Sequence, residues 1–162
     1  MRSNRGFSLI ELLVVLALIG VISAIAIPGL QESTRRNAVW SASELIGSQI
    51  RQARLKAISR NKSFQVRFDC PSVGQFRVLE LTGNTTIDNA TNRCSSQFTY
   101  DTGVLVMPST VSYGSTPPRL TVNSRGVFSS TTSIPTTITV ANGSSSRSLS
   151  VSATGQINFG TY

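Results

Sequence analysis

Residues 7–30 read FSLIELLVVLALIGVISAIAIPGL and carry one charged side chain, that of Glu11. No residue from Leu12 to Ile27 is charged. A helix of about 20 apolar residues is long enough to cross the hydrocarbon core of a bilayer. This stretch therefore predicts an apolar helix near the start of the chain, one that is surrounded by apolar groups on all sides.

Two common kinds of segment share this pattern. The short basic start, with Arg2 and Arg5, fits a secretory signal peptide, for which residues 24–26 offer a small-x-small cleavage site. An ordinary single-pass anchor fits as well, and arginines flank both of its ends, so the charges do not set its orientation. Neither interpretation accounts for Glu11, because a carboxylate inside a membrane span costs about 2.5 kcal/mol or more. A place at the headgroup level is the simplest remaining explanation for it.

A third interpretation does account for Glu11. Residues 6–15, GFSLIELLVV, resemble the processing site of type IV pilins and pseudopilins. The resemblance implies that a prepilin peptidase cuts after Gly6, on the cytoplasmic side of the inner membrane, and that the new terminal residue, Phe7, is N-methylated. It also implies that Glu11 is kept for assembly, where it pairs with the terminal amine of a neighbouring subunit and neutralises a second buried charge.

The helical pattern continues beyond the apolar stretch. Pro28 and Gly29 interrupt it, and a proline inside a helix removes a hydrogen bond and kinks the axis. The apolar stripe then resumes at steps of three and four residues, at Val39, Ala42, Ile46, Ile50, Ala53 and Ala57. We expect one long helix over residues 8–61, kinked near Pro28, whose second half is amphipathic and packs on a soluble domain.

The second half of this helix is basic. At 100° per residue, Arg51, Arg54 and Lys62 share one flank, and Lys56 and Arg60 share the other. A solvated helix face with cations near its carboxyl end is the simplest explanation, since these charges suit the helix dipole. Binding of an anion or of a neighbouring subunit is the alternative.

After residue 61 the apolar period changes from 3.6 to 2, which indicates strands. The expected strands are 64–68, 75–81, 103–107, 119–122, 126–128, 136–141, 148–152 and 156–159. Asn142-Gly143 is a strong hairpin signal and Thr154-Gly155 a weaker one, whereas residues 83–92 and 109–118 are expected to be loops. The fold class is therefore α+β.

Composition excludes several kinds of site. The chain has 15 Lys and Arg, 7 Asp and Glu, two Cys and no His, for a net charge of +8. Without His there is no imidazole base and no His metal site, so we expect neither a metal nor a cofactor. The acids after Glu44 are scattered in the sequence and show no catalytic spacing, so we expect no enzyme. Cys70 and Cys94 predict a disulfide if the domain is exported into an oxidising compartment, with two buried thiols as the alternative.

Three later segments narrow the resemblance to the GspH/FimT group of minor pilins and pseudopilins: residues 52–61 (QARLKAISRN), the turn Asp69–Ser72 and the end at residues 147–158. The resemblance implies a pilin-like fold, in which a long kinked N-terminal helix packs on a C-terminal domain of two antiparallel β-sheets. It divides the chain into a cleaved leader (1–6), a membrane and filament-core half-helix (7–30), an amphipathic half-helix (31–62) and a globular β-domain (63–162).

The implied function is that of a minor subunit, at or near the tip of a type IV pilus or of a type II secretion pseudopilus. Its partners are the prepilin peptidase, other pilin or pseudopilin subunits and the bacterial inner membrane, which it spans once. The C-terminal domain faces the periplasm, and assembly places it in an extracellular filament or a periplasmic pseudopilus.

DNA uptake is an alternative role within this group, because some members bind DNA through a C-terminal Gly-Arg-x-Arg motif. This chain has Gly155-Gln156-Ile157-Asn158 at the matching place, so both arginines are missing. The remaining candidates for phosphate contacts are Arg119, Arg125 and Arg147, although isolated arginines of a β-domain are usually surface solubility residues.

Replacing Gly6 by a bulky residue should leave the leader attached, because the peptidase needs the small residue at the cleavage point. Intact mass of the membrane-extracted protein measures this directly. The unmodified chain should lose residues 1–6 and gain one methyl group. A Gly6→Leu chain with the normal mature mass would exclude cleavage after Gly6, and a cut after Ala26 in the unmodified chain would restore the signal-peptide interpretation.

Overall fold

A computed structural model describes residues 8–160 of the chain. The first helix, α1, extends from Leu9 to Arg60 and includes Pro28, close to the predicted range. Contacts divide the chain into two units, residues 1–34 and residues 35–162. The first part of α1 belongs to the amino-terminal unit, and the remainder belongs to the carboxy-terminal unit together with all the strands. The kink at Pro28 stays a prediction.

The buried face of α1 lies in the carboxy-terminal unit. It consists of Val39, Ala42, Ser43, Ile46, Gly47, Ile50, Ala53 and Ala57, which include all six residues of the predicted stripe. Gly47 is required by a close approach, because a Cβ there would lie 2.9 Å from the ring of Phe159. The periodicity of the sequence thus predicted the buried face correctly.

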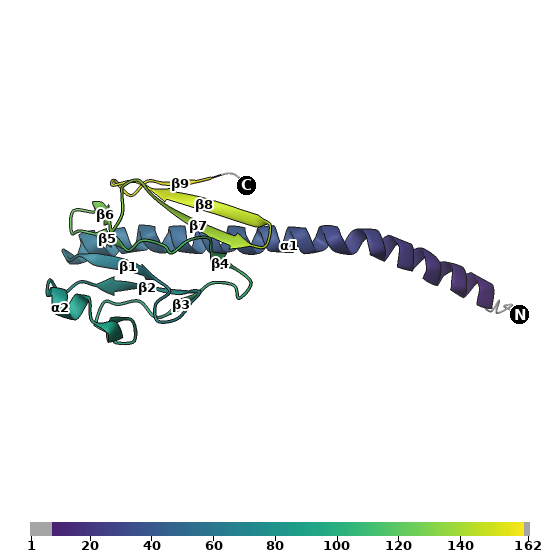
Figure 1. Ribbon diagram of the computed structural model, residues 1–162, viewed down its shortest axis with the longest axis horizontal. Coiled ribbons are helices and arrows are strands. Elements are labelled where there is room, and N and C mark those ends of the chain that lie inside the picture. The colour runs from purple at the N-terminus through teal and green to yellow at the C-terminus, as the bar shows by residue number, and fades with distance from the viewer. Residues whose placement is uncertain (1–7, 161–162) are drawn as a thin grey trace, which may run out of the picture. The chain divides into compact units, whose positions relative to one another are not determined.

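Two antiparallel sheets accompany the helix in the described part of the chain (Figure 1). The first has the order β3-β2-β1-β5-β6, and the second has the order β4-β7-β8-β9. The first sheet comprises β1 (Phe64–Phe68), β2 (Gln75–Glu80), β3 (Leu105–Val106), β5 (Leu120–Val122) and β6 (Phe128–Ser130). The second comprises β4 (Ser112–Tyr113), β7 (Thr136–Asn142), β8 (Ser145–Val151) and β9 (Ile157–Phe159).

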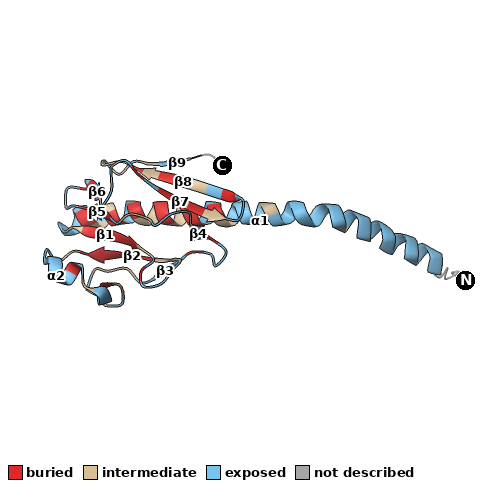
Figure 2. Cartoon of the chain, in the orientation of Figure 1, coloured by how far each residue is buried: buried red, intermediate tan, exposed pale blue. Residues whose placement is uncertain are grey.

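One hydrophobic core joins the buried face of α1 to both sheets, and Figure 2 shows the buried positions on α1 and on the strands beside it. The first sheet contributes Phe64, Val66, Phe76, Val78, Leu120, Val122 and Phe128, and the second contributes Ile138, Val140, Leu149 and Val151. Every fully buried apolar residue of residues 8–160 lies within residues 35–162. The carboxy-terminal unit therefore has a complete core of its own.

The structure departs from the predicted elements in several places. The expected loop 109–118 contains the short strand β4, and the expected loop 83–92 contains the helix α2 (Thr85–Asp88) and the start of the 3-10 helix η1 (Thr91–Cys94). The strand expected at 126–128 is displaced to 128–130, because Gly126 adopts a φ of +78° in the preceding turn. Each of these elements is shorter than the window in which an apolar period can be recognised.

Both predicted hairpins are present. β7 pairs with β8 from Thr136↔Val151 to Asn142↔Ser145, and Gly143 turns between them with a φ of +61°. β8 pairs with β9, and Gly155 turns between them with a φ of +78°. These left-handed positions are the ones that glycine occupies without strain.

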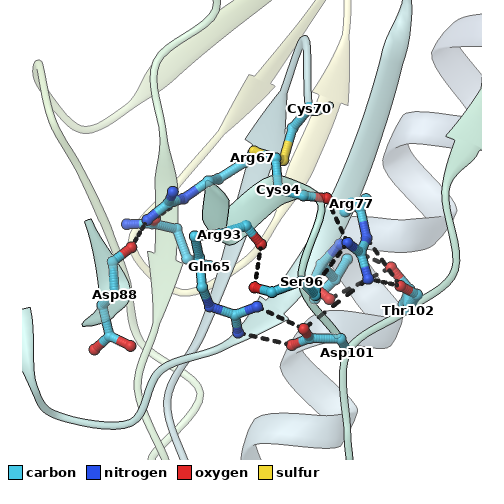
Figure 3. Close-up of a disulfide and its surroundings, with 11 residues drawn as sticks. Gln65, Arg67, Cys70, Arg77, Asp88, Arg93, Cys94, Ser96, Asp101 and Thr102 are labelled. Carbon is cyan, nitrogen blue, oxygen red and sulfur yellow. Dashed lines mark hydrogen bonds and ion pairs between the residues drawn. A yellow bond between two sulfur atoms is a disulfide. The ribbon is translucent and has the colours of Figure 1, made fainter. Parts of the chain in front are cut away.

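The outer face of the first sheet carries buried arginines. Arg67 in β1 and Arg77 in β2 are paired across the strands, and each alternates with core residues such as Val66 and Val78. Arg77 donates to the carbonyls of Cys94, Ser96 and Thr102 at 2.5, 2.9 and 2.9 Å, respectively. These bonds fasten the connection between β2 and β3 over that face (Figure 3).

Arg93 and Asp101 form a buried ion pair within this connection. The two guanidinium nitrogens of Arg93 lie 2.6 and 2.9 Å from the carboxylate of Asp101, and the exposed fractions of the two side chains are 1% and 0%. Asp101 also accepts the backbone N–H groups of Glu80 and Phe98 at 2.7 and 2.9 Å. The carboxylate is thus well compensated, which a buried charge requires.

A disulfide joins Cys70, which follows β1, to Cys94 in the same connection. The two cysteines are 24 residues apart, and closing a loop of that size stabilises the folded state by about 3 kcal/mol. The prediction of a disulfide, rather than two buried thiols, is therefore confirmed. Figure 3 shows it beside Arg67 and the Arg93–Asp101 pair, so covalent and ionic links hold the same segment.

Truncating the core face of α1 should be costly, whereas truncating the exposed face should not. Ile46 is fully buried and Leu55 is 65% exposed on the same helix. We expect Ile46→Ala to lower the free energy of unfolding of residues 35–162 by about 2–5 kcal/mol and Leu55→Ala to change it by less than about 0.5 kcal/mol. Urea denaturation followed by circular dichroism measures both values, and equal losses would contradict this assignment of faces.

Asp101→Asn should destabilise the same unit by about 3–5 kcal/mol, because it leaves the guanidinium of Arg93 without its counter-charge. Burial alone would raise the pKa of Asp101, but the hydrogen bonds from Arg93, Phe98 and Glu80 hold it below its ordinary value. The carboxylate therefore stabilises the fold above about pH 3.9, and this contribution is lost as the pH falls further, through the folded-state pKa.

The difference in unfolding free energy between the unmodified unit and Asp101→Asn should accordingly be constant near neutral pH and shrink below about pH 4. Asp69→Asn is the matched control, because the carboxylate of Asp69 is exposed and accepts one bond, from the backbone N–H of Gly74 at 2.9 Å. A difference that does not change with pH would contradict the proposed electrostatic role of Asp101.

Candidate functional site

The amino-terminal unit presents apolar side chains to its surroundings. An 18-residue window of α1 has a mean hydropathy of 2.8 and is 0% buried. Leu9, Ile25 and Leu30 are 76, 77 and 69% exposed, as are most of the large side chains between them. By length and composition, this helix can cross a membrane. Such a surface needs lipid or other apolar helices around it, because water penalises exposed apolar area.

Glu11 lies in the first turn of α1. The helix begins there, with the carbonyl of Ser8 accepting the N–H groups of Glu11 and Leu12 at 3.1 and 3.2 Å. A carboxylate in the first turn is favourable, because the helix dipole places partial positive charge at that end. Among the described residues, no side chain bonds to this carboxylate, which is exposed. It is therefore available to a cation from another molecule. Gly6 and Phe7 lie outside the described residues.

Arg147, a candidate DNA contact, is engaged inside the carboxy-terminal unit. Its guanidinium donates to the hydroxyl of Ser43 at 2.9 Å and lies 3.4 Å from the carboxylate of Glu44. It also stacks over the ring of Phe159, 4.5 Å from the ring centroid. These contacts link β8 and β9 to α1, and they favour a structural role for Arg147.

The other two candidates, Arg119 and Arg125, flank opposite ends of β5 and are exposed. Arg119 donates to the side chain of Asn89 at 3.3 Å. Burial, and then the positive charges of Arg119 and Arg93, lower the pKa of Arg67, so Arg119 adds to the crowding of cations on that sheet. The structure does not bring the three candidates together, and their contact with DNA stays a prediction.

The helix cations are grouped differently from the expectation. Lys62 was expected beside Arg51 and Arg54, but it pairs with Glu80 and stacks on the ring of Tyr100 at 5.1 Å. Arg60 covers the same ring at 4.8 Å, so Lys62 belongs to the flank of Lys56 and Arg60. The reason is local: α1 ends at Arg60 and Asn61 adopts a φ of +50°, so the helical angle no longer applies to residue 62.

The opposite flank contacts the turns of the β-domain. The Nε of Arg54 donates to the carbonyl of Gly126 at 3.1 Å. Arg51, Arg54, Leu55 and Gly155 line a pocket of about 260 Å³. Gly155 suits this place, because a Cβ there would lie 3.0 Å from the Cδ of Arg54. This cationic pocket could not be found from sequence periodicity, since the turn at Gly155 is distant from the helix in the sequence.

Chemistry of other kinds has little support in the residues that the structure describes. They contain no group of three His, Cys, Asp or Glu side chains that could hold a metal ion. The acids that are scattered in the sequence, Glu80, Asp88 and Asp101, do come together, but around the arginines that fasten the β2–β3 connection. The spacing of acids and arginines in the sequence gave no signal for this network.

Two family models match the chain. Residues 1–27 match the prokaryotic N-terminal methylation motif, and residues 42–155 match the type II transport protein GspH. The first match covers Gly6, Phe7 and Glu11, and the second covers most of the carboxy-terminal unit. Together they support the features for which the sequence resembled pilins, and they place the chain among structural subunits rather than enzymes.

Similar proteins are found by sequence over the first part of the chain. A fimbrial protein of Pseudomonas aeruginosa is 50% identical over 42 residues, which are 26% of this chain and 27% of that protein. The pilin-like protein PilA1 of Thermus thermophilus is 42% identical over 59 residues, 36% of each chain. The matched part of this chain thus spans about a quarter to a third of the length of these relatives.

Two solved structures share the fold over most of the chain. The minor pseudopilin EpsH from the type 2 secretion system of Vibrio cholerae has a TM-score of 0.53 at 17% identity and covers 76% of this chain and 96% of its own. The type IV minor pilin FimU of Pseudomonas aeruginosa has a TM-score of 0.53 at 18% identity and covers 78% and 90%. They confirm the pilin-like fold of a long helix packed on two antiparallel sheets.

The family model for residues 42–155 covers well over half of the 162 residues, and the methylation motif precedes it. The chain therefore belongs to the GspH family, as a minor pseudopilin or type IV minor pilin that carries the N-terminal methylation motif.

Proposed function

We propose that this chain is a minor filament subunit that waits in the bacterial inner membrane and then enters a filament, where it acts in assembly at or near the tip. The observation that carries the proposal is the exposed apolar helix with Glu11 as the one charge of residues 7–30. Its window is 0% buried, whereas the carboxy-terminal unit has a complete core. The helix is therefore free to exchange one apolar environment, lipid, for another, neighbouring helices.

Glu11 supplies the selectivity of this exchange. Cleavage after Gly6 creates an ammonium group at Phe7, and an apolar filament core would strengthen the attraction between that amine and a carboxylate. Pairing Glu11 of an entering subunit with the amine of a subunit already present neutralises both charges. A charge buried without its partner is strongly unfavourable, so the pair favours entry in one register.

The proposed partners follow from the same features. The methylation motif implies processing by a prepilin peptidase, and the family implies assembly with other pilins. Before assembly, residues 7–30 would cross the inner membrane once, with the carboxy-terminal unit on the periplasmic side. That side is oxidising, which agrees with the Cys70–Cys94 disulfide.

The description of the matching family, a type II transport protein, favours a pseudopilus for protein export as the filament in question. Deleting the gene distinguishes the two kinds of filament. Loss of folded exoproteins from the medium would support a secretion pseudopilus, whereas loss of surface pili with normal secretion would support a type IV pilus.

Glu11→Ala should be inserted and cleaved normally yet enter filaments poorly. Removing one partner of a buried charge pair costs about 3–5 kcal/mol, so we expect the amount of the subunit in the sheared filament fraction, relative to the membrane fraction, to fall more than tenfold. Leu12→Ala is the matched control, since it shortens the neighbouring exposed side chain and keeps the carboxylate. Unaltered incorporation of Glu11→Ala would exclude the pairing role.

A further inference from the structure

The last three turns of α1 expose a strip that mixes cations with apolar groups. We call Arg51, Arg54, Lys56 and Arg60, together with Leu55 and Ile58, the α1 strip. Leu55 is 65% exposed and Ile58 is 49% exposed. Ile58 and Arg54 both border Gly126, and the next residue, Val127, is 46% exposed. The strip therefore extends onto the turn between β5 and β6.

The strip has no counter-charge of its own within the carboxy-terminal unit. Residues 35–162 contain 13 Lys and Arg and five Asp and Glu. Each of the five acids is engaged elsewhere: Glu44 with Arg147, Asp69 with the N–H of Gly74, Glu80 with Lys62, Asp88 with Thr82 and Gly83, and Asp101 with Arg93. Among the described residues, the guanidinium of Arg51 makes no hydrogen bond or ion pair.

We propose that the α1 strip is a docking site for an acidic surface on a different filament subunit, and that it disfavours a second copy of this chain. Two copies would place like charges opposite each other, which costs several kcal/mol at an interface. The inference rests on the proposed function, because it takes the partner to be another subunit of the same filament.

The composition of the strip favours a protein over a nucleic acid. Protein interfaces combine apolar groups and arginine at their centre, as Leu55 and Ile58 do here with Arg51 and Arg54. Binding of single-stranded nucleic acid also relies on exposed aromatic rings for stacking. The ring beside the strip, Tyr100, is already covered by Arg60 and Lys62.

The pocket between Arg51, Arg54, Leu55 and Gly155, about 260 Å³ in volume, provides a specific contact. Two guanidiniums at its rim match the planar geometry of a carboxylate, which arginine binds with paired hydrogen bonds. The Nε of Arg54 is held by the carbonyl of Gly126 at 3.1 Å, so part of the site is already ordered. An Asp or Glu side chain of the partner therefore fits here.

Site-specific crosslinking in the full chain tests the proposal. Leu55 is replaced by the photoreactive residue p-benzoylphenylalanine, the protein is expressed in cells that assemble the filament, and the adduct is identified by mass spectrometry. We expect an adduct with another chain that carries the methylation motif and whose exported domain is net negative. Adding Arg51→Glu should lower its yield about tenfold or more, whereas Arg119→Glu, the same charge change on another surface, should leave it unaltered.

Four results would overturn the proposal: an adduct with a second copy, a nuclease-sensitive adduct, an adduct whose yield ignores Arg51→Glu, or no adduct at all. Circular dichroism of each variant checks that it is folded. The amount of the unmodified chain in sheared filaments is measured in parallel. A chain that is absent from filaments contradicts the proposed function, whereas a chain that enters filaments without the charge-dependent adduct contradicts the docking site alone.

Discussion

The burial of one helical face against two sheets is the constraint on which the exported part of this protein depends. Ile46 and Ile50 lie at the centre of that face and are fully buried. Both sheets cover the same helix, so neither forms a complete core without it. The buried part of α1 consequently has to be apolar at steps of three and four residues, and the opposite face is free to carry the α1 strip.

The first part of α1 obeys a different constraint. Its side chains are apolar on every side, and no part of the chain covers them. A fold that leaves this much apolar surface exposed is stable only in lipid or among similar helices. Function follows from this property, because the same helix suits both the membrane and the core of a filament. Glu11 is the one group of this segment that distinguishes the two environments.

Charge is distributed with a comparable division. Inside the carboxy-terminal unit, acids are used to compensate buried or ordered groups, as Asp101 compensates Arg93. Few acids are present, so the surface of α1 keeps its positive charge. A domain of this kind repels its own copies and attracts acidic partners, which suits a subunit present in few copies among many others.

The sequence alone determined the long helix, its buried stripe, the membrane-spanning segment, the processing motif, most strands and the cysteine pair. These are local patterns, or in the case of the cysteines the consequence of having two in an oxidising compartment. It did not determine β4, α2 or the position of Lys62 on the flank of Arg60. Short elements lack a recognisable period, and a helical angle ends where the helix ends, at Arg60.

Only the tertiary structure decided how distant charges meet. Arg93 and Asp101 form a buried pair because the connection after β2 folds back over the outer face of the first sheet. Arg51 and Arg54 form a pocket with Gly155 because the last hairpin packs on α1. Such contacts depend on strand order and on the path of connections, which no local period encodes. The physical reason is that a side chain's partners are set by the packing of whole elements, whereas its own conformation is set by its neighbours in the chain.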